Sequence, residues 1–255
     1  MALADGQVVG FSLAHVWGSL GWIGPVAVES DWQGYGIGQE LSRRALQTLR
    51  QRNCLTIGLE TWPYHLHNIA LYLKVGFNPG PLVTILERDV TGANKPFTGQ
   101  RLSDVPQPDV LLDDLARLSS TIVSGMDYRP LMQSTIVCSL GDVYVWGSES
   151  QPNAAAVIHY APRNQAPPPD YANVELLMVQ PGKERLLDSL LGEIEGLAAA
   201  AGRTKVRIAV CGCHADGLRY LVTDCGYRLV KVRLRMYSRQ QSVPPERINY
   251  LSYAV

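Results

Sequence analysis

Three alternating glycines between an apolar run and an amphipathic segment are the residues of this sequence best placed for chemistry. They stand in Gln33-Gly34-Tyr35-Gly36-Ile37-Gly38, which follows the apolar run Val26–Val28. A strand that turns directly into a helix exposes a row of backbone N–H groups, and the helix dipole adds to the anion site that they form. Glycine allows the backbone to approach a phosphate closely. The pattern therefore predicts a site for a phosphorylated ligand.

Two common phosphate-binding loops do not fit this spacing. The dinucleotide-binding fingerprint G-x-G-x-x-G would need glycine at position 39, where the chain has Gln39. The Walker loop needs a lysine after its last glycine, and none follows Gly38. A dinucleotide and a nucleoside triphosphate are thus disfavoured as ligands.

A second motif follows in Asn68-Ile69-Ala70-Leu71-Tyr72-Leu73-Lys74-Val75-Gly76-Phe77. Asn68 and Tyr72 are four residues apart, so on a helix they lie on one face, one turn apart. Gly76 is suited to the C-terminal end of that helix. A strand-like segment at residues 55–61 separates this motif from the glycine loop.

Together the two motifs resemble those of the GNAT N-acetyltransferase superfamily. The first has the form [Q/R]-x-x-G-x-[G/A] of that family's acyl-CoA pyrophosphate loop, and the second has its Asn, its Tyr four residues later and its Gly-Phe. The resemblance covers residues 1–92. It implies acetyl-CoA as the acyl donor, no metal, and direct attack by an amine.

The resemblance also implies where acetyl-CoA binds. In the family, the acyl donor lies in a notch where two parallel strands splay apart, here residues 22–28 and 55–61. The pantetheine arm pairs there with the backbone as an added strand would, and the glycine loop donates N–H groups to the pyrophosphate. The residues expected to bind the cofactor are Val26, Val28, Gln33, Gly34, Gly36, Ile37, Gly38 and Asn68.

Tyr72 is the expected general acid, because a phenol can protonate the leaving thiolate in a dry site. The general base is expected at Glu60 or Glu29, which end the two splayed strands. His65 and His67, in the loop that follows, stay open as alternatives for this role.

Composition narrows the classes of protein to which the chain can belong. Its 255 residues carry 23 basic and 23 acidic side chains, so the net charge gives no sign of nucleic-acid binding. No apolar run approaches the length of a membrane helix, and no secretory leader follows Met1. The five cysteines form an odd, irregular set, which fits a reducing cytoplasm. We expect a cytoplasmic enzyme, acting alone or as a homo-oligomer, with a small-molecule amine or peptide as its acceptor.

The order of expected elements predicts an α/β (α+β) fold with two mixed sheets flanked by helices. In the first half, Asp5-Gly6 predicts a hairpin, followed by strands at residues 7–17, 22–28, 55–61 and 82–90 and helices at 37–51 and 68–74. In the second half we expect helices at 110–124, 183–201 and 218–224. Its strands are expected at 142–146, 154–160, 174–179, 205–210 and 229–237.

The second half repeats the order of the first. Gly76-Phe77 and Gly226-Tyr227 correspond, which indicates two GNAT-like halves: a domain at 1–92, a Pro- and Gly-rich linker at 93–108, and a degenerate copy at 109–255. Gly226 lies 150 residues after Gly76, and at the same offset Leu218 and Val222 replace Asn68 and Tyr72. The loop glycines are also replaced, with Glu184 and Asp188 repelling a pyrophosphate.

Two further expectations concern the ends of the chain. The family's first half begins with a strand and two helices before the hairpin, and these are missing here, as a truncated start would explain. The alternating segment Ile248–Val255 is the candidate to cover that face. The leading interpretation is an acetyl-CoA-dependent N-acetyltransferase; the alternative is a non-catalytic acyl-CoA-binding or sensor module.

Overall fold

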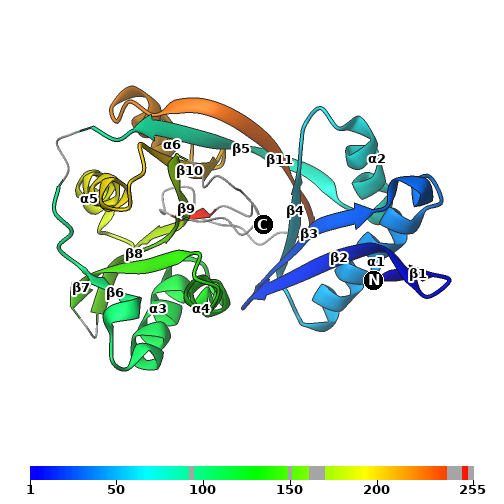
Figure 1. The fold of residues 1–255 in the computed structure, drawn as a ribbon, viewed down its shortest axis with the longest axis horizontal. Coiled ribbons are helices and arrows are strands. Elements are labelled where there is room, and N and C mark those ends of the chain that lie inside the picture. Colours follow the sequence, from blue (N-terminus) through cyan, green and yellow to red (C-terminus); the bar gives the residue numbers. More distant parts are fainter. Residues whose placement is uncertain (92–94, 149–150, 161–169, 240–248, 252–255) are drawn as a thin grey trace. The chain divides into compact units, whose positions relative to one another are not determined.

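The computed structural model describes residues 1–91, 95–148, 151–160, 170–239 and 249–251 (Figure 1). The chain divides into two compact units. Unit 1 comprises Met1–Leu82 and Val232–Ser242, and unit 2 comprises Val83–Lys231 and Val243–Ala254. Both have a mixed sheet with helices, so the expected α/β class is confirmed.

Unit 1 has a sheet of strand order β1-β2-β3-β4-β11, followed by the start of β5. Its elements are β1 (Ala2–Ala4), β2 (Gln7–Trp17), β3 (Leu20–Val28), a 3-10 turn (Ser30–Trp32), α1 (Ile37–Gln51), β4 (Thr56–Thr61), α2 (Leu66–Val75) and parts of β5 (Asn78–Asp89) and β11 (Arg228–Arg239). The expected hairpin at Asp5-Gly6 is confirmed, because β1 and β2 pair antiparallel across it. Both turn residues have positive φ, 49° and 79°, as a two-residue type I′ turn requires.

Helix α1 occupies the predicted residues 37–51. Its apolar side chains recur every three to four residues, so they form one face. Leu41, Ala45, Leu46 and Leu49 are buried, and the last three join Ile23 of β3 and Ile57 of β4 in one core cluster. This packing holds α1 on the sheet and fixes the position of the glycine loop that precedes it.

Unit 2 has the strand order β5-β10-β9-β8-β7-β6, with β12 added to β9. Its elements are the second part of β5, β6 (Gln100–Arg101), a 3-10 turn (Leu102–Asp104), α3 (Pro108–Ile122), α4 (Arg129–Val137), β7 (Gly141–Ser148), β8 (Gln151–His159), β9 (Tyr171–Val179), a 3-10 turn (Glu184–Leu186), α5 (Leu187–Ala200), β10 (Lys205–Cys211), α6 (Ala215–Thr223) and β12 (Asn249–Leu251).

The two units exchange a strand, which the sequence did not indicate. Strand β5 follows α2 of unit 1, yet its residues Val83–Asp89 pair with β10 of unit 2. Strand β11 follows α6 of unit 2, yet its residues Leu234–Arg239 pair with β4 of unit 1 (orange beside β4 in Figure 1). The contiguous domains expected at 1–92 and 109–255 therefore differ from the units of the structure, because each sheet is completed by a strand from the other half of the chain.

Part of the expected linker belongs to the fold of unit 2. Gln100 and Arg101 pair with β7, and Leu102 beside them is only 3% exposed. Glycine and proline around these residues suggested a loop, but a two-residue strand leaves too short a pattern to detect. With α3 and α4, it gives unit 2 a strand and two helices before the β7–β8 hairpin. Helix α4, which the sequence did not indicate, begins with a proline in its first turn and buries only Met132 and Thr135.

The described part of the C-terminal segment belongs to unit 2, and not to unit 1 as expected. Residues Asn249–Leu251 form β12, which pairs antiparallel with β9 of unit 2. The rest of the expected segment, residues 248 and 252–255, lies outside the described residues.

Candidate functional site

The site in unit 1 begins where strands β3 and β4 separate. They pair in parallel from Leu20 and Thr56 as far as Ile23 and Leu59. Beyond Ile23, strand β3 continues to Val28 and pairs only with β2 on its other side, through Val26, Ala27 and Val28. We call the space beside residues 24–28 of β3 the unit 1 notch. Its β3 edge presents backbone groups to which an extended ligand can pair.

The glycine loop joins the end of β3 to α1. Gly34 and Gly36 have φ of 86° and 80°, which is the left-handed region that glycine adopts without strain. A Cβ added at either position would meet nothing within 4 Å, so the loop faces open space. Gly36 caps α1 with no side-chain hydrogen bond, and the helical ladder starts with Glu40 N–H donating to Gly36 O. The earlier N–H groups of the first turn are thus oriented toward a ligand.

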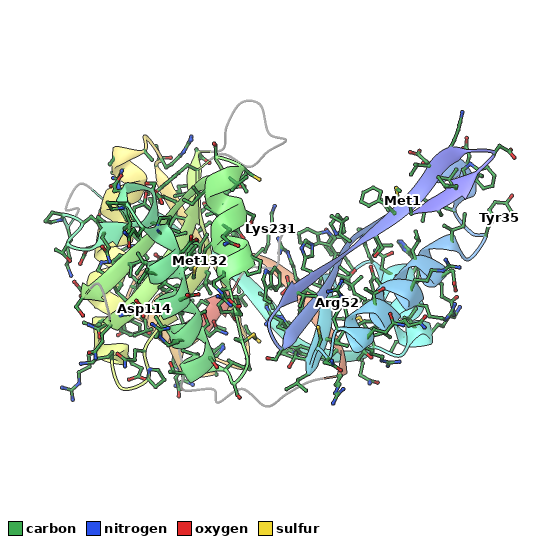
Figure 2. All side chains as sticks on the ribbon, turned by 90° about the horizontal axis from the view of Figure 1, so that it is seen from below. Met1, Tyr35, Arg52, Asp114, Met132 and Lys231 are labelled. Carbon is green, nitrogen blue, oxygen red and sulfur yellow. The ribbon has the colours of Figure 1, made fainter. Side chains whose placement is uncertain are left out.

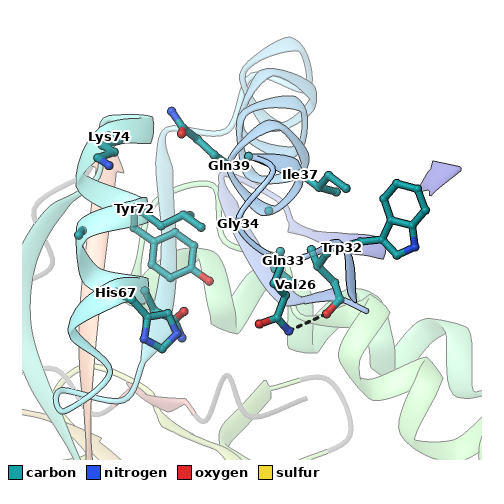
Figure 3. A pocket seen from close by; sticks show the side chains of 15 residues that line it. Val26, Trp32, Gln33, Gly34, Ile37, Gln39, His67, Tyr72 and Lys74 are labelled. Carbon is teal, nitrogen blue, oxygen red and sulfur yellow. Dashed lines mark hydrogen bonds between the residues drawn. The ribbon is translucent and has the colours of Figure 1, made fainter. Parts of the chain in front are cut away.

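Gln33 has a different partner from the one expected. Its Nε2 donates to the carbonyl oxygen of Val28 at 3.0 Å, so the side chain bridges the loop (Figure 3). The amide therefore stabilises the turn between β3 and α1. One of its two N–H groups remains for a phosphate oxygen.

Helix α2 forms the opposite wall. A cavity of about 490 Å³ separates it from the glycine loop, and Figure 3 shows the Tyr72 hydroxyl directed into it. The structure thus brings together all eight residues expected to bind the cofactor, with Tyr72. The cavity is lined by Val26, Val28, Trp32, Gln33, Gly34, Gly36, Ile37, Gly38, Gln39, His67, Asn68, Ala70, Leu71, Tyr72 and Lys74.

Burial holds the Tyr72 phenol in its protonated form. Its ring packs edge-on against Phe77, with centroids 6.3 Å apart, and against the core of unit 1. Removal from water disfavours the phenolate, which raises the pKa of Tyr72 above its ordinary value of 10.0. At neutral pH the group can therefore donate a proton.

Glu60 has both carboxylate oxygens bonded to arginines. Arg235 donates to Oε1 from Nε and Nη2, at 3.0 and 2.8 Å, and Arg233 donates to Oε2 at 3.3 Å. Its side chain is 5% exposed, and both arginines lie on β11. Both oxygens of Glu60 are thus already engaged as acceptors in ion pairs. Glu29 follows β3 and is exposed, and neither glutamate is among the residues that line the cavity.

Replacing Glu60 by Gln is expected to destabilise unit 1 by about 3 kcal/mol, because the buried Arg235 and the half-buried Arg233 lose their counter-charge. Urea denaturation measures the loss. Glu40→Gln is the matched control: Glu40 also pairs with two arginines, Arg43 and Arg44, but half-exposed in solvent. That variant should unfold like wild type. A Glu60→Gln protein as stable as wild type would show that the buried ion pairs contribute little.

Several residues of the cavity were not expected from the sequence. Leu71 and Lys74 line it, and His67, an alternative base in the sequence argument, lies beside them. These residues recur at helical spacing on α2, so they could have been predicted from the helix face that Asn68 and Tyr72 define. Trp32 comes from the 3-10 turn, for which the sequence had no signal. By contrast Tyr35, inside the glycine motif, is 77% exposed and points outward (Figure 2).

Unit 2 repeats this architecture with other side chains. Helices α2 and α6 both begin after a histidine cap, His65 and His214. Counted from these caps, Gly217 corresponds to Asn68 and Leu221 to Tyr72, one residue before the counterparts expected from Gly226. The interval from the histidine cap to the glycine is one residue longer in unit 2, from His214 to Gly226, than in unit 1, from His65 to Gly76, which explains the shift. Unit 2 thus has no phenol at the position of Tyr72.

No group of three or more metal-ligating side chains occurs within the described parts of the chain. None of the five cysteines forms a disulfide. No helix in the portions that the structure describes is long and apolar enough to span a membrane.

Comparison with known families identifies the class of domain. Residues 1–77 match the sequence profile of the acetyltransferase (GNAT) family. These residues include both motifs as well as helices α1 and α2, so the match covers the elements that form the cavity. No curated protein matched the full sequence.

Solved structures extend the resemblance in fold to the whole chain. A structure from Pyrococcus horikoshii assigned to the acetyltransferases aligns with a TM-score of 0.67 and 18% identity, over 98% of this chain and 77% of that one. A GCN5-related N-acetyltransferase from Sphaerobacter thermophilus aligns with a TM-score of 0.56 and 14% identity, over 94% and 80%. A tandem GNAT protein from the clavulanic acid biosynthesis pathway aligns with a TM-score of 0.56 and 13% identity, over 94% and 82%. The chain therefore has the GNAT fold, and a tandem arrangement occurs among its structural neighbours.

Proposed function

We propose that this chain is an acetyl-CoA-dependent N-acetyltransferase that moves the acyl group to a primary amine by direct attack, through unit 1. The observation that carries the proposal is the cavity that has the glycine loop on one wall and the hydroxyl of the half-buried Tyr72 on the other. A phosphate-binding loop and a protonated acid around one space are what transfer from a CoA thioester requires.

The residues of the cavity fit coenzyme A. The open space at Gly34 and Gly36 is a cradle that any side chain would fill, and the N–H groups at the start of α1 point to it. These amides would hold the pyrophosphate, with Lys74 adding a positive charge from α2. Val26 and Val28 would pair with the pantetheine arm along the unit 1 notch, and Asn68 would donate to it from α2.

Direct transfer of the acyl group requires one bond to form, one to break and a proton for the leaving sulfur. When bound, the thioester supplies an electrophilic carbonyl carbon and a thiolate leaving group. The amine nitrogen would attack that carbon, the C–S bond would break, and the nitrogen would give up one proton to the general base. Tyr72 donates its O–H proton to the departing sulfur. We do not assign the general base to Glu60, because both its oxygens accept bonds from arginine; Glu29 stays a prediction.

Coenzyme A binding and thiol release test this proposal. Coenzyme A at 100 times its Kd should stabilise the protein by about 2.7 kcal/mol, seen as a rise in Tm. Release of free thiol from acetyl-CoA is then measured across a panel of amino acids, polyamines and peptides. No thermal shift would contradict the proposal. Binding without turnover on any amine would favour a non-catalytic acyl-CoA-binding or sensor module.

A further inference from the structure

Strand β12 occupies the position in unit 2 that corresponds to the unit 1 notch. Strands β9 and β10 pair in parallel from Tyr171 and Lys205 as far as Val174 and Ile208, as β3 and β4 do over four residue pairs. Beyond that point β9 continues, and β12 pairs with it: Asn249 lies opposite Met178, Tyr250 opposite Leu177, and Leu251 opposite Leu176. This is the stretch of β9 equivalent to the stretch of β3 at which we place the pantetheine arm.

Side chains anchor β12 in this position. Tyr250 is 2% exposed and belongs to the main core cluster of unit 2. Its ring meets His214, the cap of α6, edge-on with centroids 5.8 Å apart. The Asn249 side chain exchanges two hydrogen bonds, of 3.0 and 3.2 Å, with the hydroxyl of Tyr128, which is itself buried.

The space for Tyr250 exists because α6 has glycine at one position. A Cβ built on Gly217 would overlap the Tyr250 hydroxyl. Gly217 is the counterpart of Asn68, the residue proposed to donate to the pantetheine arm in unit 1. This helix position would thus face the ligand in unit 1, whereas in unit 2 it faces the phenol of Tyr250.

The loop of unit 2 that corresponds to the glycine loop uses its own acceptors. The Gly182 N–H donates to the Glu184 carboxylate at 2.8 Å. Lys183 N–H donates to Gln180 O at 3.0 Å, and Leu186 N–H donates to Lys183 O at 2.9 Å. The Lys183 bond has a counterpart in unit 1, where Gln33 N–H donates to Ser30 O at 3.2 Å. At the position of Gly36, however, a carbonyl oxygen takes the Leu186 N–H, and the Glu184 carboxylate adds a charge that repels a phosphate.

We propose that β12 is an internal substitute for the pantetheine arm, so that the chain fills the acyl-CoA site of unit 2 with its own C-terminal strand. In unit 2, the Tyr250 side chain takes the space of a group of the pantetheine arm, and the Glu184 carboxylate takes the place of the pyrophosphate anion. The inference goes beyond the function proposed for unit 1, and it means that each chain binds one coenzyme A.

Hydrogen exchange on the full chain tests this occupancy without any substitution. Without ligand, the amides of residues 176–178 that face β12 should be protected, while those of 26–28 that face the unit 1 notch should exchange freely. Saturating coenzyme A should protect 26–28 and the glycine loop, leave 176–178 unchanged, and bind with a stoichiometry of one by calorimetry. Exchange at 176–178 as fast as at 26–28, or a stoichiometry of two, would overturn the inference. A stoichiometry of zero with 176–178 protected would contradict the proposed function and leave this inference standing.

A pair of substitutions tests the seat of Tyr250. Gly217→Ala should displace the Tyr250 ring, lower the Tm by about 10 °C, and remove the protection of 176–178. Adding Tyr250→Phe removes the hydroxyl that the new methyl would strike, so the double variant should regain protection and most of the Tm. If Gly217→Ala leaves exchange at 176–178 unchanged, Tyr250 does not hold β12 against β9 of unit 2, and the inference fails.

Discussion

Replacing Gly36 by Glu is expected to weaken coenzyme A binding by about 1,000-fold, as measured by calorimetry. A carboxylate would stand in the open space in front of the glycine loop, where we place the pyrophosphate. Two like charges about 4 Å apart at a protein surface repel by about 4 kcal/mol. A free energy of this size corresponds to about a 1,000-fold change in Kd. Undiminished binding would show that the phosphates lie elsewhere.

Two matched variants separate charge from backbone strain in this experiment. Gly36→Asn introduces a neutral side chain that tolerates the left-handed φ of 80°, so it should weaken binding through side-chain volume alone, and by less than Gly36→Glu. Gly182→Glu introduces the same charge at a φ of 85° with the same open space, but in the loop of unit 2. That variant should bind coenzyme A like wild type.

Tyr72→Phe is expected to lower kcat by about 10²–10⁴-fold while the Kd for acetyl-CoA stays nearly unchanged. The substitution removes the proton donor but keeps the ring that packs against Phe77. Single-turnover thiol release and calorimetry measure the two quantities separately. Tyr64→Phe is the control, because this tyrosine is 67% exposed and does not line the cavity. Wild-type turnover by Tyr72→Phe would remove Tyr72 from the mechanism.

The direction of the Tyr72 pKa shift adds a pH prediction. Burial raises this pKa above 10.0, so the acid form is the major one throughout the neutral range. As pH rises, the phenol would lose its proton only above its raised pKa. Between about pH 7 and pH 9, ionisation of Tyr72 should therefore cause no decline in kcat. Comparison of the wild-type pH profile with that of Tyr72→Phe tests this, because a decline caused by the phenol would be absent from the variant. Such a decline would mean that the phenol ionises within the range.

The role of Glu60 shows where reasoning from the sequence alone is insufficient. Its place at the end of β4 could be predicted, because a short apolar strand and its last residue are local features. Its arginine partners come from β11, 173 and 175 residues later in the chain. No periodicity or motif near Glu60 contains that contact, so a buried ion-paired carboxylate looked like a free base.

The strand exchange has the same origin. A sequence pattern predicts strands at residues 82–90 and 229–237, because side-chain alternation is local. Which sheet each strand joins depends on backbone hydrogen bonds between distant segments, and either partner offers equivalent N–H and C=O groups. Only the folded chain selects β10 for β5 and β4 for β11.

The sequence by itself determined the two motifs, the helix of residues 37–51 and the pairing of a glycine loop with Tyr72, because glycine spacing and helical periodicity act within a few turns of the chain. The tertiary structure alone decided which edges those elements share. It closed the cavity between the loop and α2, took Glu60 into an ion pair, and seated Tyr250 over Gly217. These outcomes follow from packing and charge neutralisation between residues far apart in sequence, which no local pattern encodes.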